Sequence, residues 1–293
     1  MTKNIFLCLG FLLLLAACGG KKTQTESADA ADNTAQVTDA ENADDGLEGI
    51  RIQFCFSGNM IDGTPVEFAL QLHAEDICAG YVYFPASGRE PNLVAGFIDS
   101  YYGDDGGGLE YALNLDEFMP GGNVVANYSV AFSSDPDEGN LVQYLNATCS
   151  DAGNEDLVGE ISIQGEPRMQ MPEWFKKLRQ PMAPATEGEV ASSYLYDNGI
   201  QRVSLETMAE GDGKYYFEML QEPLNGGAAY SMANEADRLG EITGNVMIYG
   251  RVNECNDSLR ITFFQQFAAA QMFRTSTQEE YCMFGNHIFL PAQ

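Results

Sequence analysis

Alternation of apolar and polar residues dominates residues 50–165 and constrains the fold more than any other feature. Val66, Phe68 and Leu70 share one side of an extended segment, whereas Glu67 and Gln71 share the other. A period of two is the signature of a strand with one buried face. The alternation recurs in the segments 50–57, 109–116 and 124–132, and further apolar segments lie at 77–84, 93–98, 141–145 and 157–163.

Turn-forming residues separate these segments. Gly, Pro, Asp, Asn and Ser gather at 62–65, 85–91, 104–108, 120–123, 133–140 and 150–156. These residue types favour turns because they adopt turn dihedral angles or hydrogen-bond their own backbone. Short strands at this spacing predict an antiparallel β-barrel or β-sandwich domain over residues 49–165.

Residues 188–293 return to strand patterns and predict a second mostly β domain. Asp197-Asn198-Gly199 separates the apolar segments 193–196 and 200–207, which is typical of a hairpin. Further strand candidates are 215–220, 242–252, 259–264 and 281–290. Phe264, Phe267 and Met272 lie at helical spacing, so part of 263–273 has helix as an alternative. Glycine pairs followed by Tyr-Ser occur in both halves, at 121–129 and 226–231, and internal duplication is one interpretation.

A connector rich in proline, residues 166–187, separates the two predicted domains. It holds Pro167, Pro172, Pro181 and Pro184. Pro172 suits the first turn of a short helix, predicted over 173–179. Basic and aromatic side chains in this segment could contact a membrane or a partner, or could pack over one end of a barrel; we favour packing.

We interpret the N-terminal segment as an export signal rather than as part of the fold. Lys3 precedes the apolar run 5–15, which is too short to cross a membrane as a helix, since that needs about 20 residues. Leu15-Ala16-Ala17-Cys18 follows and resembles the bacterial lipobox at all four positions. The resemblance implies cleavage of residues 1–17 and a covalent diacylglycerol with further acylation on Cys18. We expect this lipid to anchor the chain to a membrane.

Residues 18–48 predict a disordered acidic tether. They lack aromatic residues and carry many acids beside Lys21 and Lys22. Such a stretch cannot bury enough apolar surface to offset the entropy lost on ordering. The cysteine with its polar, acidic linker resembles lipoproteins of Bacteroidetes bacteria. That resemblance implies a cell-envelope location as an outer-membrane lipoprotein, either periplasmic or displayed at the cell surface.

Charge and cysteine content restrict partners and cross-links. With 15 basic against 43 acidic residues, a formal charge of −28, the chain is not expected to bind nucleic acid. Disulfides can form outside the cytoplasm. Cys255–Cys282 is the natural pair in the second half. In the first half Cys55, Cys78 and Cys149 allow three pairings, of which Cys55–Cys78 is our prediction, and one cysteine is left over.

The sequence carries little sign of catalysis. It has two histidines, His73 and His287, and no nucleophile elbow, P-loop or dinucleotide-binding motif. His73 lies near Glu75, Asp76 and Cys78, but a solvent-facing histidine at a strand end is the better interpretation than a metal ligand. We expect no resident metal; Asp135 and Asp137 alternate in a way that calcium could use, although solvated turns are the default.

These observations predict a lipid-anchored envelope protein that binds without catalysing. The expected partners are the membrane, through the anchor, and an unknown envelope protein or small ligand. No cofactor is expected besides the covalent lipid. The alternatives are a hydrolase of glycans or peptides that uses paired carboxylates, and a purely structural envelope protein.

Overall fold

The chain is almost entirely β-structure, which confirms the predicted mainly β class. The structure is a computed structural model that describes residues 49–102, 109–135, 141–152, 157–234, 240–252, 257–273 and 284–293. Residues Asp44–Gln293 form one compact unit. The signal, Cys18 and the tether predicted at 1–48 lie outside the described residues.

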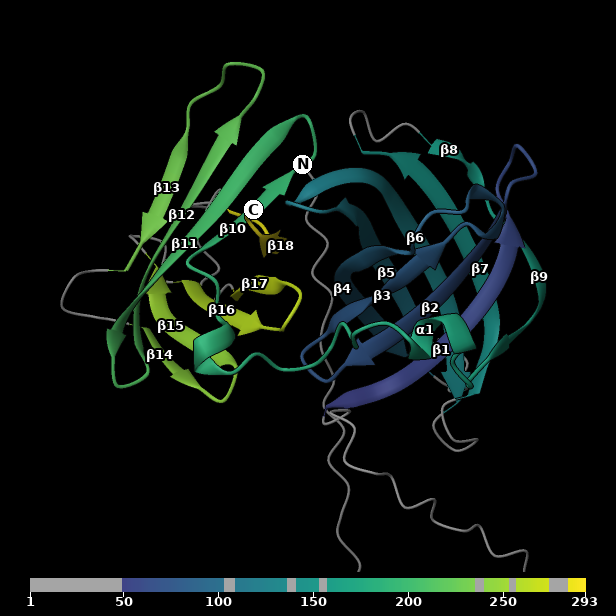
Figure 1. The fold of residues 1–293 in the computed structure, drawn as a ribbon, viewed down its shortest axis with the longest axis horizontal. Coiled ribbons are helices and arrows are strands. Elements are labelled where there is room, and N and C mark those ends of the chain that lie inside the picture. Colours follow the sequence, from purple (N-terminus) through teal and green to yellow (C-terminus); the bar gives the residue numbers. More distant parts are fainter. Residues whose placement is uncertain are drawn as a thin grey trace, which may run out of the picture. The chain divides into compact units, whose positions relative to one another are not determined.

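The first half contributes nine strands to the described part of the chain (Figure 1). They are β1 (Ile50–Asn59), β2 (Pro65–His73), β3 (Ile77–Tyr83), β4 (Asn92–Tyr102), β5 (Leu109–Met119), β6 (Asn123–Asp135), β7 (Leu141–Asp151), β8 (Leu157–Glu160) and β9 (Ser162–Arg168). A short 3-10 turn, Pro85–Ser87, follows β3. We call β1–β9 the first strand set.

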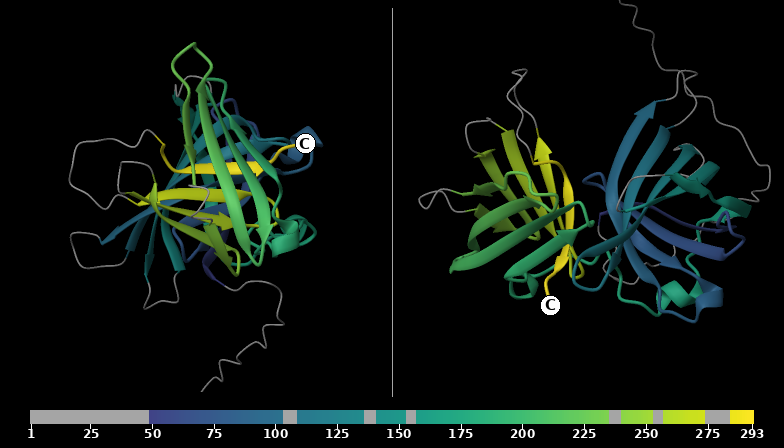
Figure 2. Two further views of the ribbon diagram at one scale, coloured as in Figure 1. Left: turned by 90° about the vertical axis from the view of Figure 1, so that its left-hand side faces the viewer. Right: turned by 90° about the horizontal axis from the view of Figure 1, so that it is seen from above.

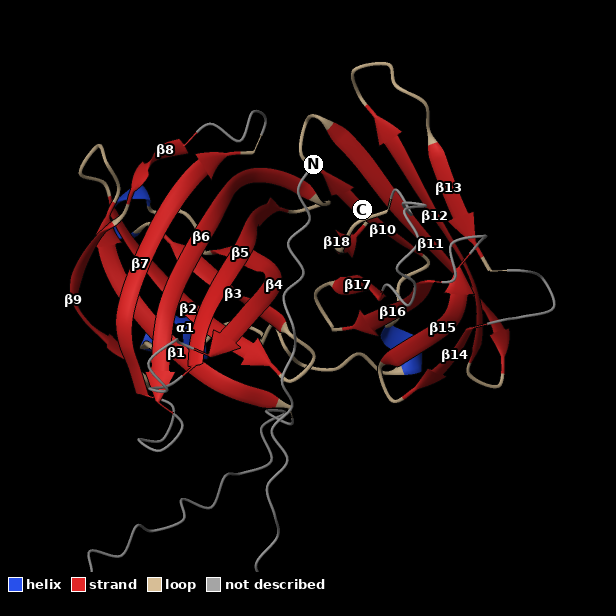
Figure 3. Ribbon diagram, turned by 180° about the vertical axis from the view of Figure 1, so that it is seen from behind, coloured by secondary structure: helices blue, strands red, loops and turns tan. Residues whose placement is uncertain are grey.

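Each strand from β1 to β7 pairs antiparallel with the next one along the chain. Ile161 lies between β8 and β9, and its N–H donates to the Ala147 carbonyl of β7, so the two short strands continue one path. β9 then pairs with β1. The ladder therefore returns to its first strand, as Figure 3 shows from behind.

The second half contributes the second strand set, β10–β18. Its members are β10 (Ser193–Asp197), β11 (Gln201–Gly211), β12 (Lys214–Pro223), β13 (Tyr230–Ala233), β14 (Gly240–Thr243), β15 (Val246–Val252), β16 (Asp257–Phe263), β17 (Ala268–Phe273) and β18 (His287–Pro291). β12 pairs with both β13 and β14, and β18 pairs back with β10 (Figure 2). A single parallel bridge, Asp197 to Asn123, joins this set to β6.

Two details of the predicted elements in this half are wrong. The segment 263–273 is not helical: Phe264 turns the chain from β16 into β17, and its N–H donates to the Phe267 carbonyl. The predicted strand 242–252 is a hairpin of β14 and β15, because Gly244 adopts a φ of +64° that closes a turn. The hairpin predicted around Asp197-Asn198-Gly199 is present as β10–β11.

Aromatic side chains fill the interior of the first set. Phe56 stacks on Phe68 with ring centroids 4.7 Å apart, and Phe54 meets Phe132 at 4.8 Å. Leucine, isoleucine and valine from β1–β7 complete this cluster. Such dense packing is that of an ordinary protein core. The apolar positions of the alternating pattern in the sequence therefore lie on the inward faces of these strands.

A second apolar cluster includes residues from both strand sets. It contains Ala69, Ala79 and Ala95, which point out of the first set, and inward-facing residues of the second set such as Phe217 and Ile261. One-sided alternation predicts solvent on the outer face of a strand. Here small alanines on that face are covered instead, and the two sets share a core.

The segment between the sets packs into this shared core. Its helix α1 (Glu173–Lys176) is shorter than the predicted 173–179, because the Leu178 N–H closes a tight turn onto the Phe175 carbonyl. Phe175 is 2% exposed and lies 5.8 Å from the Tyr81 ring. The Trp174 indole N–H donates to a Glu67 carboxylate oxygen at 2.7 Å. A 3-10 turn, Glu187–Glu189, follows before β10.

No helix among the described residues is long and apolar enough to span a membrane.

Candidate ligand pocket

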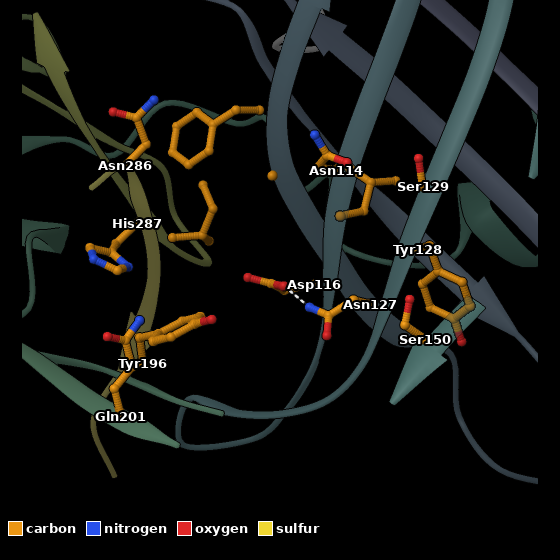
Figure 4. A pocket seen from close by; sticks show the side chains of 14 residues that line it. Asn114, Asp116, Asn127, Tyr128, Ser129, Ser150, Tyr196, Gln201, Asn286 and His287 are labelled. Atoms are coloured by element: carbon orange, nitrogen blue, oxygen red, sulfur yellow. Dashed lines mark hydrogen bonds between the residues drawn. The ribbon is translucent and has the colours of Figure 1, made fainter. Parts of the chain in front are cut away.

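A pocket of about 340 Å³ lies where polar side chains of the first set face strands β10, β11 and β18 (Figure 4). Its size is within the range of small-molecule sites. Its lining residues are Gly96, Phe97, Asn114, Leu115, Asp116, Asn127, Tyr128, Ser129, Ser150, Tyr196, Gln201, Asn286, His287 and Ile288.

Strand alternation explains the polar wall of the pocket. Leu113 and Leu115 point into the core of the first set, so Asn114 and Asp116 point outward from the same strand. The register of β5 and β6 brings Asn127 opposite Asp116. Gly96 permits β4 to lie close to β5, since a Cβ at this position would lie 1.8 Å from the Asn114 carbonyl oxygen.

Asp116 is the carboxylic acid of the pocket. It is partly buried, and its Oδ1 accepts a hydrogen bond from the Asn127 side-chain amide. Burial raises the pKa of Asp116 to about 7, and the hydrogen bond from Asn127 opposes part of that rise. Among the described residues, no lysine or arginine forms an ion pair with Asp116.

The opposite wall presents aromatic and amide groups. Figure 4 shows the Tyr196 hydroxyl extending toward Asp116 across the pocket. The Tyr196 ring contacts Phe118 at 6.3 Å and the His287 ring at 5.3 Å between centroids. The side-chain amide oxygen of Gln201 accepts a hydrogen bond from the side-chain amide of Gln221 at 2.6 Å.

His287 is held as a neutral imidazole in this wall. Its residue is 8% exposed, and its Nε2 atom has no hydrogen-bond partner within the described ranges. Burial lowers the pKa of His287 to about 4, so the ring carries no charge near neutrality. The neighbouring Asn286 is fixed, since its side-chain oxygen accepts the Met272 N–H at 2.9 Å.

The described lining does not present the pair of carboxyl groups that the hydrolase alternative needs. Glycoside hydrolysis ordinarily needs two carboxyl groups about 5–9.5 Å apart across the scissile bond. Asp116 is the one Asp or Glu in the described pocket lining, and no Lys, Arg or Cys joins it. The described lining is therefore mostly uncharged, with a single carboxyl group and the exposed polar residues Asn114, Ser129 and Asn286.

A second buried carboxyl, Glu117, lies on the inward side of the same strand. Its two oxygens accept hydrogen bonds from Asn92 and from the Tyr128 hydroxyl, each at 2.6 Å. Burial raises the pKa values of Tyr128 and, to about 11, of Cys149 beside this cluster. Glu117 is thus satisfied within the protein, and its role is structural.

The histidine considered from sequence as a metal ligand has a different role. His73 is buried, not solvent-facing as predicted, and the Phe264 ring packs against it with ring centroids 5.4 Å apart. Its Nδ1 pairs with a Glu75 carboxylate oxygen, whereas Asp76 pairs with Arg51 at 3.5 Å. Within the described ranges no three His, Cys, Asp or Glu side chains gather as a metal site.

The predicted Cys55–Cys78 disulfide is wrong, because both residues are buried free thiols, as is Cys149. Cys55 belongs to the shared core and Cys78 to the interior of the first set, so the sheet separates them. The predicted partners Cys255 and Cys282 lie outside the described residues, as do Asp137 and the side chain of the calcium candidate Asp135.

Sequence reasoning placed Asn114, Asp116 and Asn127 on polar strand faces but did not recognise a pocket. Nothing local marks these residues, since polar strand faces are normally solvated. Comparison with protein families, with curated proteins and with solved structures found no match to this chain.

Proposed function

We propose that this chain is a lipid-anchored cell-envelope protein with a non-catalytic binding role, and that the pocket around Asp116 holds its ligand. The observation that carries the binding role is the polar lining of this pocket, whose described residues include one carboxyl and no second acid to complete a hydrolase pair. We place the ligand in this pocket and not inside the first strand set, because aromatic rings occupy that interior.

The anchoring part of the proposal rests on sequence. Lys3, the apolar run 5–15 and Leu15-Ala16-Ala17-Cys18 together resemble a lipoprotein signal. The acidic residues 18–48 would then separate the folded part from the membrane surface, because anionic headgroups repel them. An outer-membrane lipoprotein, periplasmic or surface-exposed, is the location that this arrangement favours.

We further propose that the two strand sets are two antiparallel β-barrel domains joined by the connector. Support comes from the strand pairing, in which β9 returns to β1 and β18 returns to β10. The shared apolar cluster would make them one folding unit rather than two independent ones. A duplicated ancestral barrel accounts for the glycine and Tyr-Ser echo between the halves.

The anchor is tested in the native host with labelled palmitate. The proposal expects label on the mature polypeptide and an N-terminal residue at Cys18. Replacement of Cys18 by alanine should abolish both the label and membrane association. An unlabelled mature chain, or one that begins elsewhere, would overturn the envelope assignment.

The binding role is tested with the purified protein and a panel of small polar compounds that includes saccharides, amino acids, amines and carboxylates. Binding is followed by ligand-observed NMR. Ser129 is an exposed pocket-lining residue, so Ser129→Trp should fill the site and remove bound compounds. Ser231→Trp, at an exposed position of β13 that does not line the pocket, is the matched control.

Two results would replace this proposal. If Ser129→Trp still binds every compound that the wild-type protein binds, the pocket is not the site. Cleavage of a glycan or peptide by the wild-type protein, abolished by Asp116→Asn, would favour the hydrolase alternative over the binding role.

A further inference from the structure

We propose that the ligand of this pocket is a small cation, a primary or substituted amine whose ammonium group pairs with the Asp116 carboxylate. The inference rests on the proposed function and adds the chemical class of the ligand. It is carried by the way in which Asp116 differs from Asp197 and Glu117, two other enclosed carboxyl groups of the described chain.

The chain compensates two other enclosed carboxylates, Asp197 and Glu117, with its own side chains. Asp197 is 9% exposed, and its Oδ2 receives hydrogen bonds from Arg202 Nη2 at 2.8 Å and Nε at 3.0 Å. Glu117 has Asn92 and Tyr128, one for each oxygen. In each case the donors offset the loss of water around the carboxylate, which is otherwise costly.

Asp116 has one amide donor, Asn127, and no ion-pair partner among the described residues. An ionised carboxylate can accept up to about four hydrogen bonds. Water lost from the pocket when a ligand enters would leave Asp116 still poorer in donors. A ligand ammonium supplies both the missing donors and the missing positive charge, which makes a charge-assisted hydrogen bond.

The rest of the lining argues against anions. None of the described lining residues is Lys or Arg, and the chain as a whole carries a formal charge of −28, which repels anions and concentrates cations.

Two aromatic rings in the lining also suit an amine. Phe97 and Tyr196 line the pocket together with Asp116, and Figure 4 shows Tyr196 on the wall opposite the carboxyl. Aromatic faces attract cations through the ring quadrupole and also accept the apolar part of an organic amine. The volume of about 340 Å³ is suited to one small molecule rather than to a peptide or a membrane lipid.

The titratable groups of the pocket restrict the pH dependence to Asp116. The others that line it are Tyr128, Tyr196 and His287. The Tyr128 hydroxyl is turned to Glu117, and His287 stays neutral above pH about 4 because burial lowers its pKa. Deprotonation of Asp116 should therefore strengthen amine binding between pH 5.5 and pH 8.

The test uses pairs of probes that differ only in one terminal group, which is an ammonium in one probe and a hydroxyl in the other. Tyramine and 4-(2-hydroxyethyl)phenol share a ring and a chain length, but one ends in an ammonium and the other in a hydroxyl. Ethanolamine and ethylene glycol form a smaller pair. Titration calorimetry at pH 8 should show each bound amine about tenfold tighter than its alcohol, with the difference much reduced at pH 5.5.

Variants separate the role of the carboxyl from general effects of charge. Asp116→Asn keeps the shape of the side chain and should abolish the preference for the amine. Glu218→Gln removes an exposed carboxylate on β12 and should leave the preference unchanged. Thermal unfolding of both variants checks that they fold.

The outcomes distinguish this inference from the proposed function. If no amine binds, or if amine and alcohol bind equally, the pocket does not select cations and the inference is wrong. A saccharide or carboxylate that binds and is lost in Ser129→Trp would leave the pocket as the binding site while overturning the ligand class. If no compound of the broad panel binds, the proposed function fails as well.

Discussion

Asp116 and His287 line the same pocket from strands β5 and β18, and burial shifts their pKa values in opposite directions, to about 7 and about 4. Each shift favours the uncharged form of its side chain, since a charge is costly where water is reduced. The pocket therefore holds a neutral imidazole and, near pH 7, a carboxyl that is close to half protonated. Because both shifts are linked to folding, they make separate predictions for stability.

Asp116→Asn should remove a loss of stability that occurs as pH rises. The folded-state pKa of Asp116, about 7, lies above the unfolded value of about 4. The contribution of Asp116 to the free energy of unfolding is therefore fully present below pH 4. It is lost between pH 4 and 7, by about 1.4 kcal/mol per pH unit. Urea unfolding should show the variant gaining on the wild type across this window, and a constant difference would contradict the pKa shift.

His287→Phe should remove the opposite dependence. The folded-state pKa of His287, about 4, lies below the unfolded value of about 6.5. Its contribution is complete above pH 6.5 and is lost as pH falls to 4, again by about 1.4 kcal/mol per unit. Phenylalanine keeps the ring that packs on Tyr196 and Phe289. The same urea series should show this variant resisting acid better than the wild type, and equal acid sensitivity would disprove the shift.

Phe175→Ala should destabilise both strand sets together. Phe175 lies in the cluster that includes side chains of both sets, and truncation of a buried phenylalanine costs about 3–5 kcal/mol. Circular dichroism and near-ultraviolet absorbance should report one transition at a lower temperature. Lys176→Ala, at the exposed neighbouring position, is the control and should stay within about 0.5 kcal/mol of the wild type. Two separated transitions in the wild type would contradict the shared core.

Alkylation without reductant should label three cysteines of the unfolded mature domain. Cys55, Cys78 and Cys149 are free thiols, whereas Cys255 and Cys282 are predicted to be joined. In the folded protein the three thiols should react slowly, because burial raises their pKa values and reduces access. Peptide mass mapping counts the labels, and label on Cys255 and Cys282 would disprove their disulfide.

Much of the fold could be predicted from local patterns. The alternation around Phe68 and Leu113 placed the strands and their inward faces, and Asp197-Asn198-Gly199 placed a hairpin. Helical spacing of Phe264 and Phe267 was misleading, because a three-residue offset also occurs across a tight β-turn, where their rings stack at 4.5 Å. Only pairing with Pro184 and β17 decides between the two.

The sequence by itself determined the mainly β class, the strand faces and the polar character of Asn114, Asp116 and Asn127. These follow from backbone geometry, which repeats every two residues regardless of what lies elsewhere. Tertiary structure alone decided that Ala79 and His73 are covered, that Cys55 and Cys78 are apart, and that Tyr196 and His287 face Asp116. Such meetings join residues far apart in the chain, and the free energy that selects them comes from burying whole faces against one another rather than from any local pattern.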